Sequence, residues 1–112
     1  MQSGIVYYKR SGSTFDGRWS HQDTGGVFAR EVVHDAQPGP FVGSWQVEIF
    51  APDGRSLFVG QLQAVPLGDC VSLSWTKTGE TAASFVGLGH AIDPDLVMAC
   101  FEPAGGQASQ GR

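Results

Sequence analysis

The sequence predicts an all-β fold: a single antiparallel up-and-down barrel of about eight strands. Three observations support this prediction. Short apolar or alternating segments recur roughly every 8 to 14 positions between turn residues, and glycine supplies 16 of the 112 residues. No segment keeps a 3.6-residue apolar period over about ten positions, as an amphipathic helix would. A two-sheet β-sandwich has a similar pattern of strands and remains the alternative.

In the first half of the chain, three expected strands precede a long loop. The turns at 11–13 (Ser-Gly-Ser) and 23–26 (Asp-Thr-Gly-Gly) have compositions typical of tight turns. The segment 35–40 holds two prolines and a glycine, so it interrupts the strand pattern and leaves room for a single helical turn. The expected strands are 4–10, 14–22 and 27–34.

In the second half, five expected strands alternate with turns. The turn at 51–54 (Ala-Pro-Asp-Gly) is the strongest of these signals. Alternation places Trp45, Val47 and Ile49 on one face of their strand. Glycines within the strands are suited to the tight bends of a small barrel. The expected strands are 41–50, 56–65, 70–76, 82–92 and 96–101.

Length and charge restrict the domain count and the partners. We expect one domain over 1–102, followed by a polar, disordered tail over 103–112. Lys plus Arg is 7 and Asp plus Glu is 11, so the net charge is −4. This balance argues against partners such as nucleic acid or an anionic membrane. We find no secretory signal and no membrane-spanning run, and therefore expect a cytoplasmic protein.

Cysteine and histidine spacing indicates neither a disulfide nor a metal site. Cys70 and Cys100 fall on the sixth and eighth expected strands. With one strand between them they lie roughly 9–10 Å apart, whereas a disulfide needs Cα atoms within about 7 Å. We therefore expect two free thiols. The three histidines lack metal-ligand spacing and no phosphate-binding loop is found, so no metal and no cofactor are expected.

The sequence Gly43-Ser44-Trp45, at the start of a strand that an Asp-Gly turn follows, resembles the Gly-x-Trp signature of lipocalins and avidins. These families belong to the calycins, which are eight-stranded barrels. The resemblance implies that Trp45 lies at the closed base of a barrel, packed under a basic residue, with room for a small apolar molecule inside. Three strands precede the signature here, so the strand order would be circularly shifted. Arg18 or Arg30 would supply the basic residue.

Aromatic and charged residues provide the candidate ligand site. Three tryptophans fall on alternate strands and predict an aromatic-lined pocket, although they also suit an ordinary core. Adjacent tyrosines at 7 and 8 face opposite ways, as do Arg30 and Glu31, so one charge should point inward unless both reach water at a rim. An inward charge must be paired or bind a ligand. The residues named for the site are Trp19, Trp45, Trp75, Tyr7 and Arg30.

Two expected strands, 56–65 and 96–101, are apolar on both faces. Strands of this kind are normally covered on both faces. We therefore expect a homodimer that packs through the outer surface of the fifth to eighth strands.

Three functions remain open from the sequence. The first is a non-enzymatic barrel that binds a small apolar molecule. The second is a packed interaction module that acts through its outer surface as a homo-oligomer. The third is a small isomerase or cyclase acting inside a barrel. No catalytic residue is named, because no nucleophile–base pair or carboxylate pair has an interpretable spacing.

Overall fold

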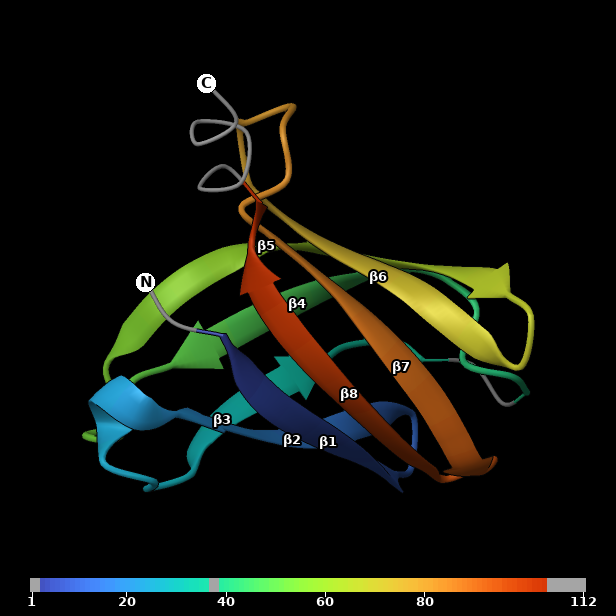
Figure 1. The fold of residues 1–112 in the computed structure, drawn as a ribbon, viewed down its shortest axis with the longest axis horizontal. Coiled ribbons are helices and arrows are strands. Elements are labelled where there is room, and N and C mark those ends of the chain that lie inside the picture. Colours follow the sequence, from blue (N-terminus) through green and yellow to red (C-terminus); the bar gives the residue numbers. More distant parts are fainter. Residues whose placement is uncertain (1–2, 37–38, 105–112) are drawn as a thin grey trace.

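The computed structural model describes residues 3–36 and 39–104, and it is a closed antiparallel barrel (Figure 1). Consecutive strands pair throughout, and β1 pairs with β8 to close the ring. This closure confirms the predicted up-and-down barrel and excludes the β-sandwich. The strands are β1 (Gly4–Ser11), β2 (Thr14–His21), β3 (Ala29–Val33), β4 (Gly43–Phe50), β5 (Ser56–Leu67), β6 (Cys70–Lys77), β7 (Phe85–Asp93) and β8 (Leu96–Pro103).

Alternation along the strands places the apolar core inside the barrel. In β6, Leu73 and Trp75 are buried, whereas Ser72 faces outward. In β8, Val97 is buried and Met98 is exposed. Because successive side chains of a strand point to opposite faces, each strand presents one face to the core. The side chains that are almost completely buried are Tyr8, Phe15, Val33, Val47, Leu62, Leu73, Trp75 and Val97.

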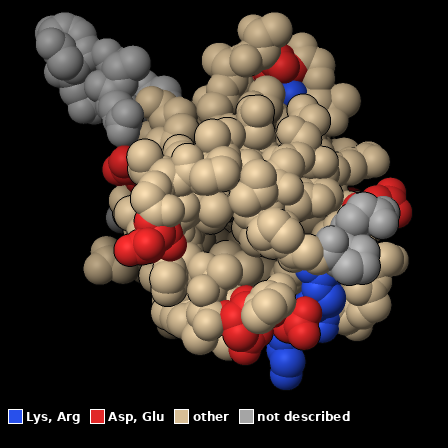
Figure 2. Space-filling view, turned by 90° about the vertical axis from the view of Figure 1, so that its right-hand side faces the viewer, with Lys and Arg blue, Asp and Glu red and all other residues tan. Residues whose placement is uncertain are grey.

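One end of the barrel is closed by packed side chains. The segment between β3 and β4 brings Phe41 over this end, where its ring lies 5.4 Å from that of Tyr8 and 4.7 Å from that of Trp45. Arg10 covers Phe15 at 4.4 Å and donates to the carbonyl of Ala36 at 3.0 Å. Figure 2 views the side with the β5–β6 and β7–β8 turns, where uncharged side chains cover the middle.

The connection between β2 and β3 differs from the expected hairpin turn. A short 3-10 helix, η1 (Gln22–Thr24), follows β2, and Gly25 takes a left-handed conformation after it. His21 caps this helix, because its Nδ1 accepts the N–H of Asp23 at 3.0 Å. The helical turn expected at 35–40 involves residues 37–38, which lie outside the described residues. β3 begins at Ala29, two residues later than expected.

Several other expectations concern the ends of the chain and the cysteines. β8 continues to Pro103, and the rest of the expected tail, 105–112, lies outside the described residues. Cys70 and Cys100 are both free thiols, as predicted. Within the described ranges, no helix has the length and apolarity needed to cross a membrane.

Candidate functional site

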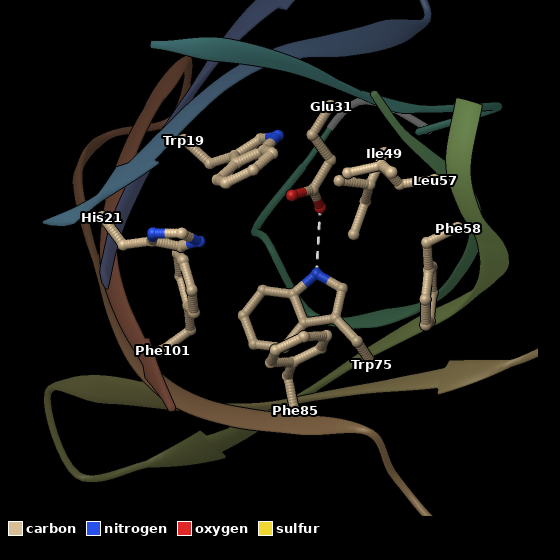
Figure 3. Close-up of a pocket in the computed structure, with 9 residues that line it drawn as sticks. All are labelled: Trp19, His21, Glu31, Ile49, Leu57, Phe58, Trp75, Phe85 and Phe101. Carbon is tan, nitrogen blue, oxygen red and sulfur yellow. Dashed lines mark hydrogen bonds between the residues drawn. The ribbon is translucent and has the colours of Figure 1, made fainter. Parts of the chain in front are cut away.

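A cavity of about 310 Å³ lies inside the barrel, toward the end opposite the packed one. It is found where β2, β4, β6 and β8 finish and where β5 and β7 begin. Figure 3 shows the side chains converging on this space from around the barrel. The lining residues are Trp19, His21, Glu31, Ile49, Leu57, Phe58, Trp75, Phe85 and Phe101.

Aromatic rings form most of the cavity wall. The ring of Phe101 lies 6.5 Å from Trp19, 6.3 Å from Trp75 and 5.9 Å from Phe85, each in an edge-on arrangement. Phe58 continues the wall at 6.4 Å from Phe85. Such edge-to-face contacts stabilise aromatic clusters beyond the burial of their surface. The rings therefore form a connected apolar surface around the space.

Glu31 is the buried charged residue of this site. It lies in the middle of β3, and only 2% of its surface is exposed. The register places it opposite Gly17, which in turn lies opposite Tyr8. A Cβ atom on Gly17 would lie 2.9 Å from the Tyr8 ring and 2.9 Å from the Glu31 carbonyl. The missing side chain at Gly17 therefore lets Tyr8 reach across β2 to Glu31.

Two donors meet at a single oxygen of this carboxyl group. The Tyr8 hydroxyl donates to Oε2 of Glu31 at 2.6 Å, and the Trp75 Nε1–H donates to the same atom at 2.9 Å. These donors come from β1 and β6, on different sides of the barrel. In Figure 3, the other oxygen, Oε1, points into the cavity. Two hydrogen bonds thus fix Oε2 of the carboxyl group, whereas Oε1 faces the cavity.

Burial determines the protonation of this cluster. Desolvation raises the pKa of Glu31 to about 7, although the hydrogen bonds from Tyr8 and Trp75 act to lower it. Desolvation, and then the nearby Glu31 charge, raise the pKa of the Tyr8 hydroxyl well above its ordinary value. Tyr8 therefore keeps its proton and remains a donor to Glu31 at neutral pH.

No lysine or arginine lines the cavity within the part of the chain that the structure describes. Arg18 and Arg30 both pair with Asp16, at 2.7 and 3.7 Å, on the outer surface of the barrel. Arg10 pairs with Asp95 at the packed end, at 3.0 Å. The ionised form of Glu31 therefore has two neutral donors and no cationic partner among the cavity residues.

His21 is the second titratable residue that lines the cavity. Its ring lies 5.4 Å from that of Trp19 and 6.5 Å from that of Phe101. Because Nδ1 accepts the Asp23 N–H, the neutral ring carries its proton on Nε2. Among residues 3–36 and 39–104, no group of three or more His, Cys, Asp or Glu residues is placed to hold a metal ion.

The five residues named from the sequence fall in three different places. Trp19 and Trp75 line the cavity. Trp45 packs at the closed end, as the calycin resemblance implies, but against Phe41. Tyr7 is 39% exposed on the outer face, and the Arg30 side chain is 58% exposed. Tyr7 and Arg30, although named for the site from the sequence, therefore face away from the cavity.

The inward members of those two pairs are Tyr8 and Glu31. Alternation showed that one of each pair faces inward but left the choice open. The choice depends on the register, which aligns Tyr8, Gly17 and Glu31 in one row. Gly17, which lies opposite the large aromatic residue Tyr8, is the sequence feature from which this row could have been predicted. Apolar residues occupy both faces of β7 and β8, so alternation does not show that Phe85 and Phe101 face inward.

The basic residue expected over Trp45 is also placed differently. Arg18 and Arg30 lie on the outer surface with Asp16. The arginine that covers an aromatic ring at the closed end is Arg10, and that ring is Phe15. Comparisons of the chain with protein-family models, with curated proteins and with solved structures found no match.

Proposed function

We propose that this barrel binds one small, mainly apolar molecule in the cavity between Trp19, Trp75 and Phe101. The observation that carries the proposal is an aromatic-walled cavity of about 310 Å³ into which Oε1 of Glu31 points. That volume is about twice the roughly 150 Å³ of an apolar cavity known to take up benzene. A few polar groups in an apolar pocket are typical of small-molecule sites.

The cavity favours this function over the alternatives from the sequence. An interaction module with a fully packed interior has no need of a space this large. An isomerase or cyclase would use the same carboxyl group, but no observation identifies a reacting partner for it. Kinship with the lipocalins and avidins is part of the proposal, supported by the closed eight-stranded barrel and the position of Trp45. The free thiols of Cys70 and Cys100 suit the proposed cytoplasmic location.

The three tryptophans allow a direct test by nuclear magnetic resonance. The indole N–H signals of Trp19 and Trp75 report on the cavity, whereas that of Trp45 reports on the packed end. Titration with benzyl alcohol, a neutral single-ring probe, should move the first two signals in a saturable way. The Trp45 signal should stay in place. Absence of any saturable shift, with benzyl alcohol or with its amine analogue, would contradict the proposed function.

A matched pair of substitutions locates the binding site. Ile49→Phe adds bulk to the cavity wall, whereas Ile5→Phe makes the same change on the outer face, where Ile5 is 56% exposed. We expect Ile49→Phe to weaken benzyl alcohol binding and Ile5→Phe to leave it unchanged. Unchanged far-ultraviolet circular dichroism of both variants would show that the barrel is retained.

A further inference from the structure

We propose that the cavity is selective for cationic ligands, small aromatic amines whose ammonium group is placed against Oε1 of Glu31. The inference rests on the proposed function and adds to it a chemical class of ligand and a residue that determines specificity. It depends on the hydrogen bonding of the carboxyl group, on the charges around the cavity and on the aromatic character of its wall.

The hydrogen bonds of Glu31 leave one oxygen for a ligand. Tyr8 and Trp75 both donate to Oε2, at 2.6 and 2.9 Å, and they fix the carboxyl group from two sides of the barrel. Oε1 points into the cavity (Figure 3). An ionised carboxylate accepts hydrogen bonds on both oxygens. A ligand that donates a hydrogen bond therefore meets an acceptor that is already oriented.

The charges around the cavity favour a donor that is also a cation. A buried carboxylate without a positive partner is unfavourable. Within the described residues, the cavity wall includes no lysine or arginine and Glu31 forms no ion pair, so a permanently charged cation is lacking there. An ammonium group on the ligand would provide the missing charge and would form a charge-assisted hydrogen bond, which is stronger than a neutral one. The net charge of −4 adds a weak general attraction for cations.

The cavity wall is also suited to a cation. In Figure 3, Trp19 lies to the left of the carboxyl group and Trp75 lies below it. Aromatic faces attract cations within about 6 Å of the ring centre, and tryptophan does so most strongly. The rest of the wall, with Phe85 and Phe101, would contact the apolar part of the ligand. An aromatic amine therefore matches both the polar and the apolar parts of the site.

The proposal predicts that binding depends on pH. An amine ligand binds the ionised carboxylate of Glu31, so its binding competes with protonation of Glu31. The pKa of Glu31 is about 7 in the free protein. The ionisable groups that face the carboxyl group within the barrel are Tyr8 from β1 and His21 from β2, while β4 and β6 present Ile49 and Trp75. The neighbouring charged groups on the outer face are Asp16, Arg18, Arg30 and Glu48.

The test compares three probes that share a ring: benzylamine, benzyl alcohol and benzoate. Dissociation constants come from the indole N–H shifts of Trp19 and Trp75. We expect benzylamine to bind more tightly than benzyl alcohol at pH 8, and benzoate to bind most weakly. Between pH 6 and pH 8 the affinity for benzylamine should rise by about tenfold, because the ionised fraction of Glu31 rises by that factor. The affinity for benzyl alcohol should change little.

Substitutions separate the carboxylate from other sources of pH dependence. Glu31→Gln keeps the shape and removes the charge, so benzylamine should bind roughly tenfold or more weakly at pH 8, with no rise between pH 6 and pH 8. Glu48→Gln makes the same change on the outer face of β4 and should behave as the unaltered protein. A positive charge on His21 would repel benzylamine and would therefore also weaken its binding at lower pH. His21→Gln must retain the pH dependence if Glu31 causes it.

The outcomes distinguish this inference from the proposed function. If benzyl alcohol binds in the cavity but benzylamine has no advantage at pH 8, the inference is wrong and the binding function stands. The same conclusion follows if Glu31→Gln binds benzylamine as tightly as the unaltered protein. If none of the three probes shifts the Trp19 and Trp75 signals, the proposed function itself is wrong.

Discussion

Glu31 is a buried carboxyl group that has hydrogen-bond donors but no opposite charge. Tyr8 and Trp75 stabilise its ionised form, whereas burial in an aromatic surrounding destabilises it by more. The balance raises its pKa above the ordinary value of 4.5 to about 7. Protonation therefore stabilises the folded protein, because the folded state holds this proton more tightly than the unfolded chain does.

The stability of the protein should consequently fall as pH rises through this range. The contribution of Glu31 is fully present below the unfolded pKa near 4.5 and is lost as pH rises through the folded pKa near 7. At pH 8 the loss is about 3 kcal/mol, from about 1.4 kcal/mol for each unit of pKa difference. Urea unfolding of the ligand-free protein at pH 5, 6, 7 and 8 measures it.

Glu31→Gln provides the control for this prediction. The amide cannot ionise, so the variant should lose this pH dependence and should be more stable than the unaltered protein at pH 8. Glu48→Gln, on the outer face, should keep the dependence. A Glu31→Gln variant that is equally destabilised at every pH would show that Glu31 is ionised throughout.

At the scale of the strands, Gly17 on β2 leaves the space through which Tyr8 on β1 reaches Glu31 on β3. Tyr8, Gly17 and Glu31 form one row across β1, β2 and β3. Gly17→Ala would place a methyl group 2.9 Å from the Tyr8 ring and from the Glu31 carbonyl. We expect a loss of about 1–3 kcal/mol in the free energy of unfolding, which is typical of overpacking, and a changed midpoint in the pH dependence of stability.

Gly89→Ala is the matched control on β7. Its added Cβ would lie 3.1 Å from a Val71 methyl group and 3.2 Å from a Leu73 methyl group, and side chains of this kind can shift. We expect a smaller loss of stability there and no change in the pH midpoint. Equal effects of the two substitutions would contradict the role of Gly17 in admitting Tyr8 to Glu31.

The sequence predicted the strands well and the site only in part. Turn residues and alternation identify eight segments, because both signals are local. Which member of the pair Arg30 and Glu31 faces inward depends on how β3 pairs with β2, and a shift of one residue reverses every side chain. Trp19 on β2 and Trp75 on β6 lie on strands that do not pair with each other, so their meeting around one cavity is a property of barrel closure.

At the scale of the whole molecule, we propose a homodimer that forms through the outer surface of the barrel. Of the surface expected on the fifth to eighth strands, Leu88 on β7 and Met98 on β8 are exposed, and β1, which lies outside that expectation, adds Ile5 and Tyr7. Cys100, paired with Ile5 and Leu88, joins these positions in one region. Monomeric proteins rarely expose large continuous apolar patches. This region is the proposed contact with a second copy.

Size-exclusion chromatography with light scattering tests the oligomeric state. We expect a mass of twice 11.9 kDa at micromolar concentration. Met98→Asp should shift the population toward the monomer, because it adds charge within the apolar region. Gln46→Asp on the outer face of β4 should leave the mass unchanged. A monomer at micromolar concentration in the unaltered protein would contradict the dimer.

The proposed binding function and the proposed ligand class both depend on Glu31 as a buried, titratable group inside the barrel. The most direct test is the ¹³C chemical shift of the Glu31 side-chain carboxyl group as a function of pH, with and without saturating benzylamine. We expect a midpoint near pH 7 in the free protein. Benzylamine should lower this midpoint, because a bound cation favours the carboxylate and the coupling is reciprocal. A midpoint near 4.5, or one that benzylamine leaves unchanged, would contradict the proposed role of Glu31 in ligand binding.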